Sequence, residues 1–336
     1  MTRDLTSVTR RPQTSQGEEL AQSPSESGLS RRGFLGGAAV AGAGLAGLAA
    51  AAPAAEVTPA TSQWHWLNIT SERMPRIIEK VQGVCLLPWG CIERHGPHLP
   101  MGTDTLTMEA VTLQATEIEP AVVFPPLYFG QIAEARHCPG TISLDHGLLL
   151  QLAQAVLDEI GRNGFKKIVI VNGHGGNGSM IGYLLMSMLQ RRRPYVVYQS
   201  GGGMSEADRK RWREMQPPIR DGHAGFVETV CMMAVRPSMV HLEECQDPND
   251  GAARGRQKHL GGMQNSFSWY ADYPTQFSGD VPKTATAEAG AFYIAACARE
   301  LARRIKLIKA DDVTARLAEQ FYDGVDRVGL PPKPAR

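Results

Sequence analysis

The sequence predicts an α/β domain built around a mostly parallel sheet, and three observations support this fold class. Short apolar runs rich in β-branched residues, which are typical of buried strands, alternate along the chain with amphipathic helical patterns. Strands separated by helices favour parallel pairing, because each helix carries the chain back to the starting edge of the sheet. Hydrophobic residues make up 43% of the chain, so a core of ordinary size can form.

Four segments of the chain are expected to be strands. The clearest is residues 166–171, where Lys-Lys-Ile-Val-Ile-Val combines β-branched side chains with a short continuous apolar run. Residues 84–87 and 121–124 have the same short apolar character, and residues 195–198 form the fourth segment. Runs of this length indicate buried strands.

Three helices are expected where apolar residues recur at a spacing of three or four. Residues 149–160 carry one such stripe, which an Asn-Gly pair terminates. A second helix is expected over residues 178–188. A third covers residues 286–305, with apolar side chains at every fourth position in its second half.

Composition divides the chain into three regions. Residues 1–55 are expected to be a polar leader with an export signal, residues 56–325 a single domain, and residues 326–336 a C-terminal tail. Within the domain, residues 245–283 are rich in Gly, Asp, Asn, Gln and Ser. This composition predicts a long irregular segment, suited to a lid or a subunit contact.

The leader carries the pattern of a twin-arginine export signal. Arg31-Arg32 precedes a mildly apolar run at residues 36–52, which ends in small residues. We therefore expect the twin-arginine export machinery to carry the protein to the periplasm or outside the cell. A run of about 20 residues could also remain as a membrane anchor. Its many Gly and Ala residues make it weakly hydrophobic, which favours cleavage over anchoring.

Charge and cysteine content exclude some classes of protein. The chain has 35 Lys and Arg against 34 Asp and Glu, and this balance argues against a nucleic-acid-binding protein, which needs a basic face. The six cysteines form no Cys-x-x-Cys pair and no zinc-ribbon spacing. Several lie in apolar contexts and are expected to be small core residues.

Histidines and carboxylates gather in three glycine-containing segments, at residues 90–104, 171–177 and 221–229. The first two follow predicted strands, and ligands of open α/β sheets bind beyond the carboxyl ends of the strands. The segments can therefore converge although they lie far apart in the sequence. Their nitrogen and oxygen donors suit a hard or borderline divalent metal ion.

Within these segments, spacing and charge favour two metal ions. Glu93 and His95 are separated by one residue, so both can face one centre, and nearby glycines and prolines can return Asp104 to it. The carboxylates of Glu93, Asp104 and Glu228, together with a bridging hydroxide, would balance the charge of two divalent ions. Other histidines carry weaker signals: His98 and His137 could hydrogen-bond a loop or touch a substrate.

Four motifs resemble those of the creatininase family of metal-dependent amidohydrolases. They are Gly-x-Ile-Glu-x-His-Gly-Pro-His-Leu-Pro-x-Gly-Thr-Asp at 90–104, Pro-Gly-Thr-Ile-Ser-Leu at 139–144, Asn-Gly-His-Gly-Gly-Asn at 172–177 and His-Ala-Gly-x-x-Glu-Thr at 223–229. The resemblance covers roughly residues 65–310. It implies a three-layer α/β/α fold, a site for two divalent ions (zinc, manganese or iron) and hydrolysis of a C–N amide bond. It also implies a homo-oligomer, often a hexamer.

Site roles follow from the same resemblance. It implies five metal ligands, with Asp104 as the bridge between the ions: Glu93, His95, Asp104, His174 and Glu228. It assigns proton transfer to His223. Creatininase itself has a glutamate where this chain has Gly176, and members with glycine there use the glutamate that matches Glu228.

Two departures from the family pattern argue against creatinine as the substrate. Creatininase places a tryptophan lid before the His-Ala-Gly motif, whereas this chain has Pro217-Pro218-Ile219-Arg220, and it has an aromatic residue where this chain has Gly175. The expected substrate is another small amide, cyclic or formyl, or a peptide end, attacked by metal-bound hydroxide. The alternative is an exported α/β protein that binds metal or ligand without turnover. A binding protein has no need of His223, so that residue favours the enzyme.

Overall fold

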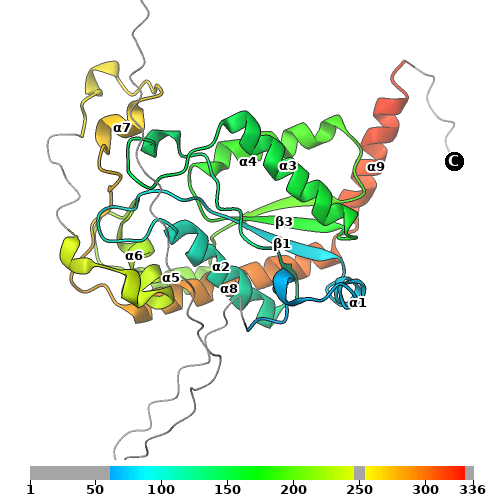
Figure 1. Ribbon diagram of the computed structural model, residues 1–336, viewed down its shortest axis with the longest axis horizontal. Coiled ribbons are helices and arrows are strands. Elements are labelled where there is room, and N and C mark those ends of the chain that lie inside the picture. Colours follow the sequence, from blue (N-terminus) through cyan, green and yellow to red (C-terminus); the bar gives the residue numbers. More distant parts are fainter. Residues whose placement is uncertain (1–60, 246–253, 330–336) are drawn as a thin grey trace, which may run out of the picture. The chain divides into compact units, whose positions relative to one another are not determined.

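The computed structural model describes residues 61–245 and 254–329 (Figure 1). The predicted leader and most of the predicted tail therefore lie outside the described residues. Four parallel strands form one sheet in the order β2-β1-β3-β4. Their bounds are β1 Val84–Trp89, β2 Val122–Val123, β3 Lys167–Asn172 and β4 Val196–Gly201. All four overlap the segments expected to be strands.

The side chains of the strands alternate between two apolar layers. Val84 and Leu86 of β1 face a cluster built with three helices, α2 Thr103–Ile118, α6 Phe226–Val235 and α8 Ala287–Ala310. Cys85 and Leu87 face the opposite cluster, which contains α3 His146–Arg162 and α4 Asn177–Ser187. Figure 1 shows these helices on either side of the sheet. The predicted three-layer α/β/α fold with a parallel sheet is thus confirmed.

Local signals set the ends of the predicted helices. Asp145 caps α3 by accepting a hydrogen bond from the Leu148 backbone N–H at 3.0 Å. Gly164 then takes a φ of +107°, a conformation that glycine adopts without strain, and the chain turns toward β3. Thr286 caps α8 in the same way, accepting from the Ala289 N–H at 3.3 Å.

Helix α6 is the apolar run that the segment at residues 221–229 opens. The other remaining helices were not among the sequence predictions. They are α1 Met74–Lys80, α2, α5 Glu206–Met215, α7 Ser268–Asp272 and α9 Val313–Asp326. The predicted irregular segment at residues 245–283 contains α7, and residues 246–253 of it lie outside the described residues. No helix in the described part of the chain is both long and apolar enough to cross a membrane.

Register and close packing position the loops that follow the strands. Trp89 at the end of β1 pairs with Asn172 at the end of β3, and the Gly173 N–H donates to the Trp89 carbonyl at 2.9 Å. The two following loops therefore start side by side. Gly90 lies against the first turn of α2, where an added Cβ would stand 2.4 Å from Oγ1 of Thr105. Glycine at this position allows α2 to approach the end of the sheet.

Candidate metal centre

Six side chains singled out in the sequence meet beyond the carboxyl ends of β1 and β3. Glu93 and His95 lie in the loop after β1, and Asp104 lies in the first turn of α2. The others are His174 after β3, His223 just before α6, and Glu228 in the first turn of α6. The first four residues are buried, with at most 6% of any of them exposed. The two from the α6 region are partly exposed, at 12% for the His223 side chain and 29% for that of Glu228.

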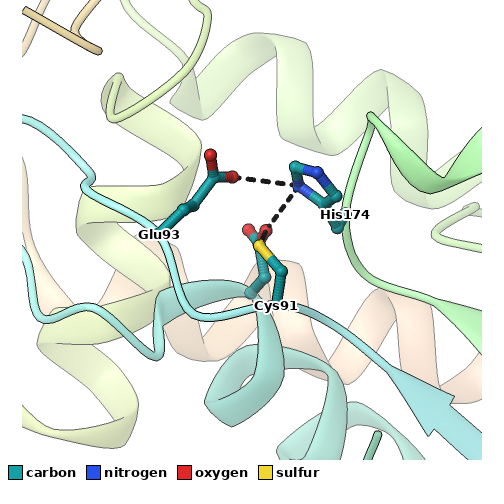
Figure 2. Close-up of side chains that lie close together, drawn as sticks. Cys91, Glu93 and His174 are labelled. Atoms are coloured by element: carbon teal, nitrogen blue, oxygen red, sulfur yellow. Dashed lines mark hydrogen bonds and ion pairs between the residues drawn. The ribbon is translucent and has the colours of Figure 1, made fainter. Parts of the chain in front are cut away.

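Asp104 stands between two groups of donor atoms. Its Oδ2 lies 2.9 Å from Nδ1 of His174, and its Oδ1 lies 3.1 Å from Nε2 of His95. We call Cys91, Glu93, Asp104 and His174 the first donor group, and His95, Asp104 and Glu228 the second. Within each group the donor atoms lie within 4.8 Å of one another. Figure 2 shows the Glu93 carboxylate directed toward the ring of His174, with the sulfur of Cys91 below them in this view.

Backbone carbonyls orient the three histidines. One ring nitrogen of each lies near a carbonyl oxygen: Nδ1 of His95 at 3.1 Å from Glu93, Nε2 of His174 at 2.9 Å from Gln131, and Nε2 of His223 at 2.8 Å from Arg94. A carbonyl only accepts hydrogen bonds, so these nitrogens carry the hydrogen. In the neutral ring the other nitrogen then presents its lone pair to the carboxylates. Metal-binding histidines are held in this way.

In this arrangement the lone pairs of the histidine nitrogens face those of the carboxylate oxygens. A positive charge between them, from a proton or a metal ion, relieves the repulsion. Burial disfavours protonation of His95, but the attraction of Asp104, Glu228 and Glu93 raises its pKa to about 10. The pKa of His174 likewise rises well above its ordinary value despite burial, because Asp104 and Glu93 stabilise its cation. Burial favours a neutral Asp104, yet the attraction of His95 and His174 holds its pKa well below its usual range.

The same positions suit a divalent cation. Oε1 of Glu93 is buried and lies 2.9 Å from Nδ1 of His174, but it has no hydrogen-bond partner of acceptable geometry. Carboxylate oxygens and imidazole nitrogens, directed at a common point, are the donor set of zinc and related ions. The residues therefore fit a metal centre, with a cation replacing the protons on His95 and His174.

His223 and Glu228 complete the side of the centre near α6. The ring of His223 lies 4.4 Å from that of His95, and its Nδ1 lies 3.9 Å from Oε1 of Glu93. Oε2 of Glu228 accepts a hydrogen bond from the Ala224 N–H at 2.6 Å and lies 3.7 Å from Nε2 of His95. Ala224 takes a left-handed φ of +56°, which folds the backbone over the carboxylate.

A cavity of about 410 Å³ opens onto both donor groups. Trp269 and Gln276 form one wall, and Nε1 of Trp269 donates to Oε1 of Gln276 at 2.9 Å. Nε2 of Gln276 in turn donates to the Glu134 carbonyl at 3.3 Å, and the Glu134 side chain also lines the cavity. The ring of His223 meets Trp269 edge to face at 6.0 Å.

Several residues of this region were not identified from the sequence, and the roles of others remained undecided. It treated Cys91 as an ordinary cysteine, whereas its Sγ lies 3.2 Å from Oδ2 of Asp104. Trp269 lies in a segment without periodicity, so no sequence signal identifies it. His98 and His137 are hydrogen-bonded, respectively to the Thr229 hydroxyl at 2.9 Å and to the Pro274 carbonyl at 2.6 Å, and neither lines the cavity.

The chain is similar to curated proteins whose names describe the hydrolysis of amides or peptides. The chain is 32% identical over 178 residues to the mycofactocin precursor peptide peptidase of Mycolicibacterium smegmatis, covering 50% of this chain and 64% of that protein. It is 30% identical over 178 residues to the creatinine amidohydrolase of Pseudomonas putida, covering 49% of this chain and 68% of the other. The chain thus spans just under two thirds of the first relative.

Solved structures and a family model extend the similarity. A crystal structure of creatinine amidohydrolase aligns with a TM-score of 0.60 at 25% identity, over 73% of this chain and 97% of the other. A manganese form of creatininase aligns with a TM-score of 0.62 at 24% identity, over 72% and 97%. The family model described as creatininase (creatinine amidohydrolase) matches residues 68–305. This match includes all six site residues, and the chain belongs to the creatininase family of hydrolases.

Proposed function

We propose that the protein is an exported, dinuclear metal-dependent amidohydrolase. Its substrate is a small amide, cyclic or formyl, or a peptide end. The observation that carries this proposal is the position of Asp104, whose two carboxylate oxygens each face a separate donor group. A carboxylate in this position would serve as a ligand to both ions of a two-metal hydrolase.

The two donor groups divide the ligands between the ions. Glu93, Asp104 and His174 would hold one ion, and His95, Asp104 and Glu228 the other. Divalent ions held there would supply an activated water near neutral pH and would polarise the amide carbonyl. The carboxylates of Glu93, Asp104 and Glu228 would fix the positions of both ions, and Trp269 forms one wall of the cavity beside them.

His223 is positioned to carry the proton. Its Nε2 is fixed by the Arg94 carbonyl, so its Nδ1 is free to take a proton from the attacking water on the cavity side. The C–N bond would then break as that proton passes to the amide nitrogen, which leaves as a neutral amine, while the carbonyl carbon becomes a carboxylic acid that loses its remaining proton to solvent. Protonation matters because an amide anion is a poor leaving group.

The substrate class is supported by the relatives and by the departures from creatininase. The relatives named above are a creatinine amidohydrolase and a precursor-peptide peptidase, so amide hydrolysis is common to them while the substrates differ. Residues 217–220 lack the tryptophan of the creatininase lid. A substrate other than creatinine accords with both observations.

The decisive experiment measures metal and turnover on the same sample. The mature protein, purified after expression in a host with twin-arginine export, is analysed for metal and incubated with a panel of cyclic, formyl and peptide amides. Two ions per chain together with hydrolysis support the proposal. Tight uptake of a ligand without turnover would favour the binding protein instead.

Localisation and assembly are part of the proposal. Arg31-Arg32 ahead of the small-residue run supports export by the twin-arginine machinery, cleavage, and a periplasmic or secreted mature protein. We also propose that the protein assembles as a homo-oligomer, with a hexamer as the expected form. Light scattering of the purified protein tests the assembly.

A further inference from the structure

Cys91 lies inside the metal centre and not in an apolar core. It follows β1 in the loop that carries Glu93, and none of its surface is exposed. Its Sγ lies 3.2 Å from Oδ2 of Asp104 and within 4.8 Å of the donor atoms of Glu93 and His174. In Figure 2 its sulfur lies close to the Glu93 carboxylate and the His174 ring, below both in this view.

Other buried cysteines of the described chain have different surroundings. Cys85 belongs to the apolar layer beneath α3 and α4, and Cys231 and Cys297 belong to the layer between the sheet and α8. Those three serve as small core side chains. Cys91 instead contacts a carboxylate of the donor group.

A second observation indicates that the first donor group awaits a cation. Glu93 is 2% exposed, and its Oε1 points into the group, 2.9 Å from Nδ1 of His174 but with no hydrogen bond of acceptable geometry. His174 presents the lone pair of its Nδ1 to the same point, because its Nε2 is fixed by the Gln131 carbonyl. With Asp104, three oxygen and nitrogen donors therefore surround the point that the Cys91 sulfur also faces.

We propose that Cys91 is a fourth protein ligand of the ion held by Glu93, Asp104 and His174, and that it makes this position selective for zinc over manganese. This inference rests on the metal centre of the proposed function. On binding, the S–H bond breaks, the proton passes to solvent, and the sulfur lone pair binds the ion. Thiolates favour zinc, whereas carboxylates also suit manganese, so one sulfur ligand shifts the preference between the two.

Zinc K-edge X-ray absorption on the zinc-loaded wild-type protein tests the ligand directly. A zinc–sulfur shell appears at about 2.3 Å, distinct from nitrogen and oxygen at about 2.0–2.2 Å. With two zinc ions per chain, we expect about half a sulfur per zinc on average. The shell is expected to vanish in Cys91→Ser and to persist in Cys138→Ser, which alters a buried cysteine outside the donor group.

Selectivity is tested by dialysis against equal concentrations of zinc and manganese, followed by metal analysis. The bound zinc-to-manganese ratio is expected to fall by about tenfold in Cys91→Ser and to stay unchanged in Cys138→Ser. A wild-type spectrum with only nitrogen and oxygen neighbours would overturn the inference. This test uses the wild-type protein alone, so its outcome does not depend on whether a variant folds. Protein that binds no zinc at all would instead contradict the metal centre itself.

Discussion

At the residue scale, Asp104 is the side chain on which both donor groups depend. It is the one residue common to both groups, and its two oxygens lie at 2.9 and 3.1 Å from ring nitrogens on opposite sides. Its position in the first turn of α2 fixes it relative to the sheet. Two ions in neighbouring positions repel each other, and a shared carboxylate offsets that repulsion.

Asp104→Ala is therefore expected to lose most of both metal ions and nearly all activity. Glu228→Gln is the matched comparison, because it alters the second donor group alone and is expected to lose mainly one ion. Elemental analysis of metal per chain checks both variants. Full occupancy in both would show that another set of ligands holds the metal.

His223→Asn separates proton transfer from metal binding. The variant is expected to keep both ions and to lose about 10²–10⁴-fold in kcat, the usual contribution of a positioned acid–base group. His137→Asn is the control, since His137 contacts a backbone carbonyl and lies outside the cavity lining. Metal content and kcat are measured on the same preparation. Parallel loss of metal and activity would move His223 into the ligand set.

Glu134 gives the cavity a negative charge that the metal centre does not balance. Among the described residues no lysine or arginine lines the cavity, and the two proposed ions would offset the carboxylates of the donor groups. We therefore expect an amide carrying a positive group to be hydrolysed faster than its neutral isostere. Glu134→Gln should reduce that preference by roughly five- to tenfold, since a charge pair in a wet cavity contributes about 1 kcal/mol.

Ratios of kcat/KM for a cationic and a neutral amide of equal size measure this preference. Glu117→Gln, a change of the same chemistry on the exposed end of α2, serves as the control. Metal content is expected to be unchanged in both variants. If wild type and Glu134→Gln prefer the cationic amide equally, another residue recognises the positive charge.

At the element scale, the close approach of α6 and α8 holds Glu228 in place. Gly290 of α8 lies directly against α6, where an added Cβ would stand 1.8 Å from the carbonyl oxygen of Val230. That carbonyl lies two residues beyond Glu228 on the same helix. Helix α8 therefore contacts the same stretch of α6 backbone that carries Glu228, so the position of α8 affects the second donor group.

Gly290→Ala is expected to destabilise the fold by about 1–3 kcal/mol or more, as overpacking usually does. Displacement of α6 should also weaken binding of the second ion. Gly182→Ala is the matched helical control: its Cβ would meet open space, so it is expected to gain up to about 1 kcal/mol from helix propensity. Denaturant unfolding measures both free energies. Equal stabilities would show that α8 can shift without cost.

Elements with strong local patterns could be predicted from the sequence, and α2 shows why others could not. The residues of β3 form a continuous apolar run because both of its faces are covered. The buried face of α2 instead includes Asp104, Thr105, Thr112 and Thr116, so it lacks an apolar stripe. Likewise, the motif residues that gather beyond β1 and β3 could be named from the sequence, whereas no sequence signal identified Cys91 or Trp269 as part of the site.

At the scale of the whole molecule, the expected leader would determine where the enzyme works. Replacing Arg31-Arg32 by two lysines is expected to leave unprocessed protein in the cytoplasm, because the paired arginines are the recognised feature of the signal. Arg10-Arg11 offers a control pair that no apolar run follows, and the same replacement there should leave export unchanged. Cell fractionation with immunoblotting measures the mature protein. Normal periplasmic yield from the Arg31-Arg32 variant would contradict export by this route.

The register that pairs Trp89 with Asn172 also determines when an ion can be captured. Parallel pairing of β1 with β3 joins segments about 80 residues apart, and such long-range contacts form slowly during folding. Before they form, Glu93, His174 and Glu228 are scattered along an extended chain that cannot chelate one ion tightly. Refolding should therefore proceed at a rate independent of metal concentration, with uptake as a later step, so that the metal incorporated depends on the ions present around the folded protein as well as on the preference of its ligands.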